Sequence, residues 1–191
     1  MISFTAQAAE SGYSPAAVKA AFLHRFASYV EWPVEAAPAD TFIIAVSGAD
    51  DVAEQLEGLL PGLKIQNRSA RVRRVAAPDE LEGAQILYIG SSVKRVGPLL
   101  AAAERHPILT VTDSAEGLAT GSVINFVQVG RNIRFEVSLP AAERSRLRID
   151  SGLLSVAARV EEQPRAGLWQ DRRFFARRKE RAPGIRDRGN S

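Results

Sequence analysis

Apolar residues recur at helical spacing in one stretch near the start of the chain and occur in short unbroken runs after it. The first stretch follows Ser14 and Pro15, a pair that favours a helix start because the serine hydroxyl can accept an unpaired backbone amide and proline fits the first turn. The apolar residues are then spaced four apart: Val18, Phe22, Phe26 and Val30. Pro33 disfavours helical geometry at Trp32. We therefore predict an amphipathic helix from about Pro15 to Trp32.

Three later runs are almost entirely apolar, as expected for strands that are buried on both faces beneath helices. These strands are predicted at residues 42–46, 85–89 and 108–111. The segments between them predict a helix at 50–60 capped by Asp50 or Asp51, a half-exposed strand at 68–75, a helical turn or loop at 78–83 and a helix at 93–105. Strands therefore alternate with helices over the first two thirds of the chain.

The pattern changes after residue 112. Two strands, 123–129 and 133–139, are separated by Gly130, Arg131 and Asn132, which predicts an antiparallel hairpin. A short helix at 140–147 and a closing helix at 151–162 follow. The predicted fold class is α/β: a three-layer sandwich with a mixed sheet, built from partly Rossmann-like alternation and completed by the hairpin and the closing helix. Its expected core anchors are Phe22, Phe26, Tyr29, Phe126 and Phe135.

Two separated blocks of the sequence resemble the YfiR-like family. The first block contains Lys19-Ala-Ala-Phe-Leu and Tyr29-Val-Glu-Trp-Pro. The second contains Ile124-Asn-Phe-Val, Arg134-Phe-Glu-Val and Leu153-Leu-Ser-Val-Ala. The resemblance spans roughly residues 14 to 161. The chain departs from the family pattern at Ser138, where an asparagine often stands.

The resemblance implies a function. Members of the family are small periplasmic proteins best known as repressors of membrane-bound diguanylate cyclases. It therefore implies a non-enzymatic periplasmic protein that binds the periplasmic sensor domain of an inner-membrane diguanylate cyclase and holds it inactive until an envelope signal releases it, with effects on c-di-GMP signalling and biofilms. It is also compatible with a homodimer. Disulfide-linked redox behaviour of some relatives cannot carry over, because this chain has no cysteine.

Five residues are candidates for contact with such a partner. Trp32 and Pro33 open a loop that runs to residue 38, and exposed apolar residues there or on the hairpin would form a binding surface. Asn125, Arg134 and Glu136 are polar residues within apolar strands and match the family pattern. Buried polar groups need partners, so these three could instead form a hydrogen-bond network that fixes strand register.

Small polar residues follow each of the three buried strands, and they suggest a second hypothesis. The candidates are Ser47, Gly48, Gly90, Ser91, Ser92, Thr112 and Asp113. In an open parallel sheet, ligands bind in the crevice outside the carboxyl ends of the strands. A small-ligand-binding protein for sensing or transport would use these loops. The alternative interpretation is that Ser92 and Asp113 only cap helices or turns.

The sequence offers little for catalysis. His24 lies within the first predicted helix, and His106 precedes Pro107 at a turn. Neither histidine stands beside a nucleophile elbow, a phosphate-binding glycine loop or a zinc-binding helix motif. The acidic residues occur as adjacent pairs that point in different directions. We therefore predict no catalytic residue, no cofactor and no metal site.

The ends of the chain differ from the predicted domain at 14–163. Residues 164–191 carry a net charge of +6 within a chain of net charge +3, so the rest of the chain is mildly acidic. Nucleic-acid binding would rest on this tail alone and is not predicted; a disordered tail is expected, with approach to an anionic membrane surface as the alternative. Residues 1–13 are expected to be flexible. Ala6-Gln-Ala has the form of a signal-peptidase site, which indicates a truncated signal peptide or an alanine-rich terminus.

Overall fold

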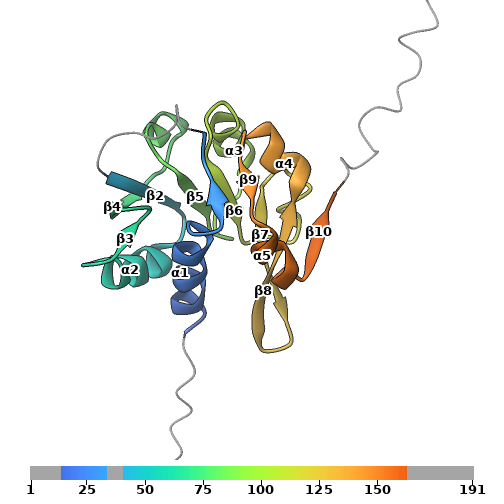
Figure 1. The fold of residues 1–191 in the computed structure, drawn as a ribbon, viewed down its shortest axis with the longest axis horizontal. Helices are drawn as coiled ribbons and strands as arrows, with labels where there is room; N and C mark the ends of the chain where they lie inside the picture. The colour runs from blue at the N-terminus through green and yellow to red at the C-terminus, as the bar shows by residue number, and fades with distance from the viewer. Residues whose placement is uncertain (1–13, 34–40, 163–191) are drawn as a thin grey trace, which may run out of the picture.

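The computed structural model describes residues 14–33 and 41–162 (Figure 1). The helices are α1 (Pro15–Phe26), α2 (Asp50–Leu59), α3 (Gly97–Ala103), α4 (Leu139–Arg144), α5 (Ser151–Val156) and a short 3-10 helix, η2 (Pro78–Leu81). The strands are β1 (Val30–Glu31), β2 (Thr41–Ser47), β3 (Lys64–Ile65), β4 (Arg68–Arg74), β5 (Ile86–Ile89), β6 (Leu109–Thr112), β7 (Ile124–Val129), β8 (Asn132–Ser138), β9 (Arg148–Ile149) and β10 (Arg159–Glu161). The predicted loop at 34–40, the N-terminal segment and the basic tail lie outside the described residues.

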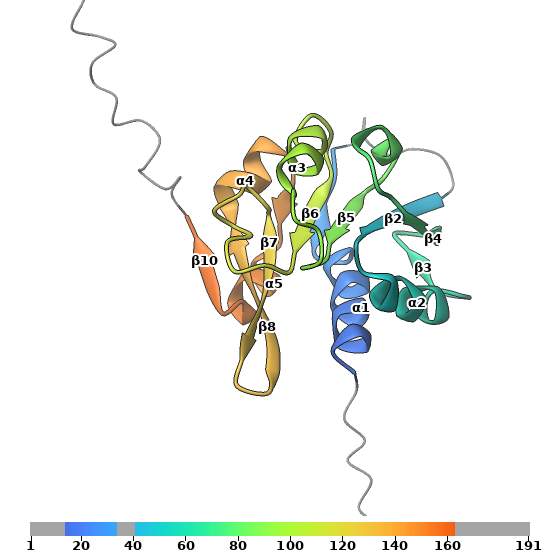
Figure 2. The ribbon, with the colours of Figure 1, turned by 180° about the vertical axis from the view of Figure 1, so that it is seen from behind.

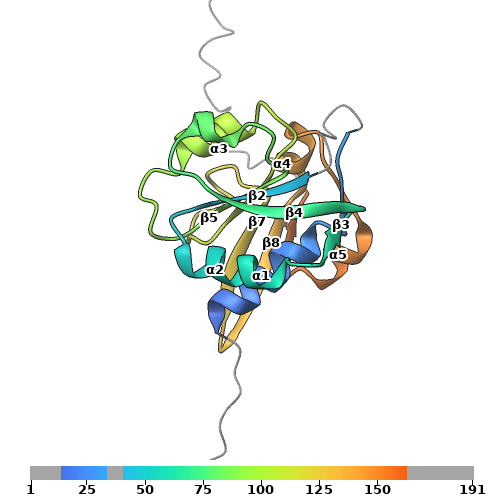
Figure 3. The same cartoon turned by 90° about the vertical axis from the view of Figure 1, so that its left-hand side faces the viewer.

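The predicted fold class is confirmed. Eight strands form one mixed sheet in the order β10-β8-β7-β6-β5-β2-β4-β3, and β1 and β9 form a separate antiparallel pair. The central strands β4, β2, β5, β6 and β7 are parallel, while β8 is antiparallel to β7, as the hairpin pattern predicted. Viewed from the side, α3 and α4 lie above the sheet, and α1, α2 and α5 lie below it (Figure 3).

The first helix begins where the sequence predicted but ends earlier. Ser14 caps it, and its hydroxyl accepts a hydrogen bond from the amide of Ala17 at 3.1 Å. The helix ends at Phe26, so the predicted continuation to Trp32 is wrong. Val30 leaves the helix because its backbone pairs with β9, a strand distant in sequence. The buried face of the helix is made by Ala16, Ala20, Leu23 and Phe26, while Val18 and Phe22 are half-buried.

Three other predicted helices are also shorter than expected, and the one predicted at 140–147 ends at Arg144. The closing helix ends at Val156, and residues 159–161 form β10, which pairs in parallel with β8. The helix predicted from residue 93 begins at Gly97, because Pro98 fits only the first turn of a helix. The helix after β2 is capped by Ala49, so neither Asp50 nor Asp51 is its cap. The errors fall at element ends, where pairing with a distant strand or the position of a proline decides the boundary.

An aromatic cluster joins α1 to the hairpin. The rings of Phe22 and Phe26 lie 5.0–5.9 Å from those of Phe126 and Phe135. Phe26, Phe126 and Phe135 are at most 3% exposed, and Phe22 packs partly buried against them. Aromatic pairs at these separations add stabilisation beyond area burial. The first helix and the hairpin are therefore held together on one face of the sheet.

Candidate functional site

The three strand-end loops converge as the parallel order requires, but two of them pack directly on each other. The amide of Gly90 donates to the Ser47 carbonyl at 2.9 Å, and the Ser92 hydroxyl donates to the Gly48 carbonyl at 2.6 Å. A Cβ atom at Gly90 would overlap that same carbonyl oxygen. The contact leaves no room for a ligand between the two loops. Ser91 is exposed and makes no hydrogen bond within the described part of the chain.

Asp113, at the end of β6, forms a partly buried polar cluster with α1. Its carboxylate lies 2.5 Å from the Lys19 ammonium group and accepts a 3.4 Å hydrogen bond from the Tyr88 hydroxyl. Burial raises the pKa of the Tyr88 phenol above its usual range, and the Asp113 charge raises that pKa further. Tyr88 therefore stays protonated and donates. The cluster ties α1 to the carboxyl edge of the sheet.

Asn125 and Thr112 form a buried hydrogen-bond network. The Thr112 hydroxyl donates to the Asn125 side-chain oxygen at 2.9 Å and lies 2.8 Å from the Ser122 hydroxyl. The Ser114 amide donates to the same Asn125 oxygen at 3.3 Å. Gly117 packs so closely on this network that a Cβ atom there would overlap it. Because Asn125 is 2% exposed, the structure favours the network interpretation for this residue over contact with a partner.

The other two polar hairpin residues differ from each other. Glu136 is partly buried and accepts two hydrogen bonds of 3.0 Å from the Arg159 guanidinium. Arg159 is the residue of β10 that lies opposite Glu136 of β8. These bonds raise the pKa of Arg159. Arg134 is exposed, and the only hydrogen bond of its side chain within residues 41–162 goes to the Val156 carbonyl at 3.4 Å. Arg134 is therefore available for a partner, whereas Glu136 already has an internal one.

Trp32 is half-buried rather than exposed at the start of a loop. Its ring packs edge-on against the Phe42 ring, with 5.5 Å between the centroids. The Arg68 guanidinium lies over the Phe42 ring, 5.1 Å from its centroid. The Trp32 indole nitrogen is buried and has no hydrogen-bond partner among residues 14–33 and 41–162. Pro33 is half-buried as well. The interpretation of Trp32 as an exposed surface residue therefore needs correction, because the indole contributes to the packing of β2.

The outer half of the hairpin has two unpaired edges. β6 pairs with β7 only at Ile124 and Asn125, and β10 pairs with β8 only from Glu136 onward. Residues 127–134, which we name the distal ribbon, pair only with each other among the residues that the structure describes, and they project beyond the sheet (Figure 2). Val129 within it is 55% exposed. An unpaired strand edge can accept a strand from another protein.

An apolar groove of about 260 Å³ lies beside the distal ribbon, between α1, β8 and α5. Its lining includes Phe22, Tyr29, Phe135, Leu153 and Val156. Val156 at its rim is 55% exposed and receives the hydrogen bond from Arg134. We name this apolar groove the aromatic groove, and it adjoins the distal ribbon. The sequence analysis missed the groove, because its lining comes from three elements that only the fold brings together.

Two other kinds of feature are absent from residues 14–33 and 41–162. No cluster of three or more histidine, cysteine, aspartate or glutamate side chains gathers there. No helix in those ranges is long and apolar enough to cross a membrane.

Comparison with known proteins gives a family match and several distant structural likenesses, two of which follow. The family described as YfiR/HmsC-like matches residues 16–158. The fold is similar to that of a conserved domain protein from Vibrio cholerae O1 biovar El Tor, with a TM-score of 0.51 and 12% identity over 79% of this chain and 62% of that one. A weaker likeness, with a TM-score of 0.45 and 9% identity over 63% of this chain and 55% of that one, is to the ABC domain in complex with L-Trp from Streptococcus pneumoniae. The chain spans less than two thirds of either protein, and the Vibrio likeness concerns the fold alone.

Proposed function

Because the chain belongs to the YfiR/HmsC-like family, whose match covers residues 16–158, we propose that it regulates diguanylate cyclase signalling in the periplasm by binding another protein. The family is regulatory and acts through protein contacts. The specific proposal is that the chain represses a membrane-bound diguanylate cyclase by binding its periplasmic sensor domain. The resemblance identified in the sequence, now supported by the family match, is what makes a cyclase the expected partner.

The observation that carries this proposal is the surface formed by the distal ribbon and the aromatic groove. An apolar groove beside an unpaired strand edge suits a partner segment that adds backbone hydrogen bonds and inserts one or two apolar side chains. Exposed aromatic and aliphatic groups in a pocket are the usual centre of a protein interface. We name the combined surface the docking surface.

The charge of the docking surface points to the kind of partner segment. Arg25 lines the groove, Arg131 lies at the turn of the distal ribbon, and Arg134 donates to the Val156 carbonyl at the rim of the groove. None of these three arginines forms an ion pair within the described residues. A segment with acidic residues flanking an apolar centre would complement them, and such complementarity raises the association rate and suppresses wrong partners.

Repression by binding requires only that the chain prefer one state of its partner. A partner that exchanges between an inactive and an active conformation is shifted toward the state that binds more tightly. A coupling free energy of about 1–3 kcal/mol changes the active fraction several-fold to a hundredfold. An envelope signal would relieve repression by weakening this preference.

The test measures the c-di-GMP content of a strain that lacks this chain but retains its candidate partner. That partner is a membrane cyclase encoded by a neighbouring gene, which we call the neighbouring membrane cyclase. We expect c-di-GMP to rise on deletion and to return to normal with the wild-type chain, which should also co-purify with the periplasmic domain of the cyclase. A chain carrying Val129→Asp and Val156→Asp should fold but fail to restore repression, because it places two carboxylates on the docking surface. Unchanged c-di-GMP on deletion would contradict the proposal.

The second hypothesis, a small-ligand site at the strand-end loops, has less support. Gly48 and Gly90 are in direct contact, and Thr112 and Asp113 have partners within the chain. No observation at those loops favours a ligand over these internal contacts.

A further inference from the structure

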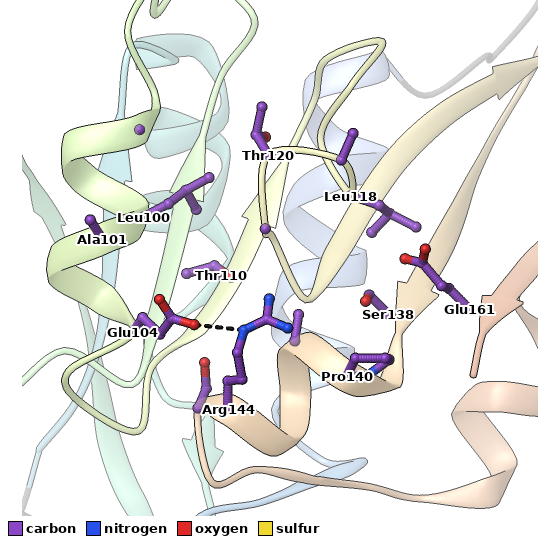
Figure 4. A pocket seen from close by; sticks show the side chains of 15 residues that line it. Leu100, Ala101, Glu104, Thr110, Leu118, Thr120, Ser138, Pro140, Arg144 and Glu161 are labelled. Carbon is purple, nitrogen blue, oxygen red and sulfur yellow. Dashed lines mark hydrogen bonds and ion pairs between the residues drawn. The ribbon is translucent and has the colours of Figure 1, made fainter. Parts of the chain in front are cut away.

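A separate pocket of about 430 Å³ (Figure 4) lies on the α3 and α4 side of the sheet. The aromatic groove lies on the opposite side, with α1 and α5 (Figure 3). The walls of the pocket are α3, α4 and the loop at 118–121, and Thr110 and Ser138 from the sheet form its floor. This volume is near the lower end of the range for small-molecule sites, so the pocket suits a small metabolite. Nothing in the proposed regulatory function uses it.

The apolar part of the lining is aliphatic. It is formed by Leu100 and Ala101 of α3, Leu118 of the loop and Pro140 of α4. No aromatic side chain is among the residues that line the pocket. The lining therefore suits a short aliphatic group better than a flat ring, which would seek an aromatic partner for stacking.

One cation and two carboxylates border the same space. The Arg144 Nε atom donates to the Glu104 carboxylate at 2.6 Å, across the gap between α4 and α3 (Figure 4). Both side chains are about half exposed, at 48% and 51%. Glu104 is the only hydrogen-bond partner of the Arg144 guanidinium in the described part of the chain, so two of its nitrogens remain to bind a ligand. Glu161 borders the pocket beside Ser138.

The hydroxyl groups of the lining add neutral donors and acceptors. Ser138 and Ser145 are each 4% exposed, and neither hydroxyl has a hydrogen-bond partner within residues 41–162. The Thr110 hydroxyl accepts from the Val123 amide at 3.0 Å and keeps its own proton to donate. These groups can complete the hydrogen bonding of a bound carboxylate.

The charges favour a ligand that carries both signs. A simple anion would meet the guanidinium but also two carboxylates, and a simple cation would meet the carboxylates but also the guanidinium. We propose that this pocket binds a small aliphatic amino acid, whose carboxylate takes the free guanidinium nitrogens of Arg144 and whose ammonium group takes Glu104. Hydrogen bonds in which both groups are charged are the strong ones, and here each ligand charge has one.

The test measures binding of L-valine, L-leucine, L-isoleucine and L-methionine to the full chain by titration calorimetry. We expect saturable one-site binding of at least one of them. Its deaminated acid and its decarboxylated amine should each bind at least about tenfold more weakly, since each lacks one charged hydrogen bond. Equal affinity for the deaminated acid, or no binding of any of the four amino acids, would overturn the proposal.

Variants locate the site. Arg144→Leu should abolish binding, and Ala101→Phe should do so by filling the pocket from an exposed helix position. Arg105→Leu removes the same charge from an exposed arginine outside the lining and should bind as the wild type does. Thermal unfolding checks that each variant is folded. Wild-type affinity in Arg144→Leu would place the ligand elsewhere and overturn the assignment. Binding to the cyclase domain is measured separately and tests only the regulatory proposal. A variant that loses amino-acid binding but still binds the cyclase domain therefore distinguishes the two proposals.

Discussion

The inner and outer halves of the β7–β8 hairpin are one continuous strand pair with opposite environments. In the inner half, Phe126 and Phe135 are at most 3% exposed, and the buried side-chain oxygen of Asn125 accepts two hydrogen bonds. In the outer half, no strand of the described residues pairs with the distal ribbon on either side, and Val129 is 55% exposed. The comparison teaches that the hairpin is anchored at one end by the core, which allows the other end to present a preformed edge. A preformed edge costs less ordering entropy when it binds.

The comparison of the two halves also distinguishes two kinds of polar residue in the family pattern. Asn125 and Glu136 belong to the family pattern, yet both make their hydrogen bonds within the chain. Arg134 belongs to the same pattern and is exposed beside the groove. Substitution of Asn125 or Glu136 should therefore weaken partner binding only by disturbing the fold. Substitution of Arg134 should weaken partner binding directly.

Phe126→Ala should give the largest effect, because it removes an aromatic ring from the inner half of the hairpin. Its ring contacts those of Phe22, Phe26 and Tyr88. We expect a loss of about 3–5 kcal/mol in the free energy of unfolding, measured by chemical denaturation. A loss below about 1 kcal/mol would show that the inner half is not the anchor.

Asn125→Ala should cost less, about 1–3 kcal/mol, because it leaves the buried Thr112 hydroxyl and the Ser114 amide without their acceptor. The matched control is Asn132→Ala, an exposed asparagine at the start of β8 in the outer half. The control should change the unfolding free energy by no more than about 0.5 kcal/mol. Equal effects of the two substitutions would remove the distinction between the halves.

The pH dependence of stability tests the packing beneath the inner half. An exposed tyrosine in the unfolded chain ionises near pH 10, whereas burial keeps Tyr88 protonated in the folded chain. Above about pH 10 the unfolded state therefore binds fewer protons, and Tyr88 lowers stability as pH rises, by up to about 1.4 kcal/mol per pH unit. Tyr88→Phe should lack this slope. Parallel stability curves for the wild type and Tyr88→Phe would contradict the assignment.

The sequence predicted the features that local patterns determine. Ser14 and Pro15 marked the start of α1, and Gly130-Arg131-Asn132 marked the hairpin. The alternation of apolar runs predicted a sheet between helices, and the family resemblance is confirmed. Each of these signals lies within a few residues of the element it predicts.

The features that were missed depend on contacts between distant residues. The two-residue strand β1 exists because β9 pairs with it, and β10 replaces a predicted helix because β8 accepts it. Asn125 and Arg134 gave the same signal, a polar residue within an apolar strand, but the first lies in the inner half and the second in the outer half. Which polar residue is buried depends on the neighbours that the fold supplies, and the aromatic groove has the same origin.

The most direct measurement is the affinity of the purified chain for the periplasmic domain of the neighbouring membrane cyclase, compared with that of the Val129→Asp, Val156→Asp variant. The account predicts binding by the wild-type chain, at least about tenfold weaker binding by the variant, and an unfolding free energy within about 1 kcal/mol of wild type, since both positions are exposed. The control Arg105→Leu, at an exposed residue that follows α3 and lies outside the docking surface, should bind as the wild type does. Equal affinity of the wild type and the variant, or no binding by the folded wild-type chain, would contradict the claim that this protein acts through its docking surface.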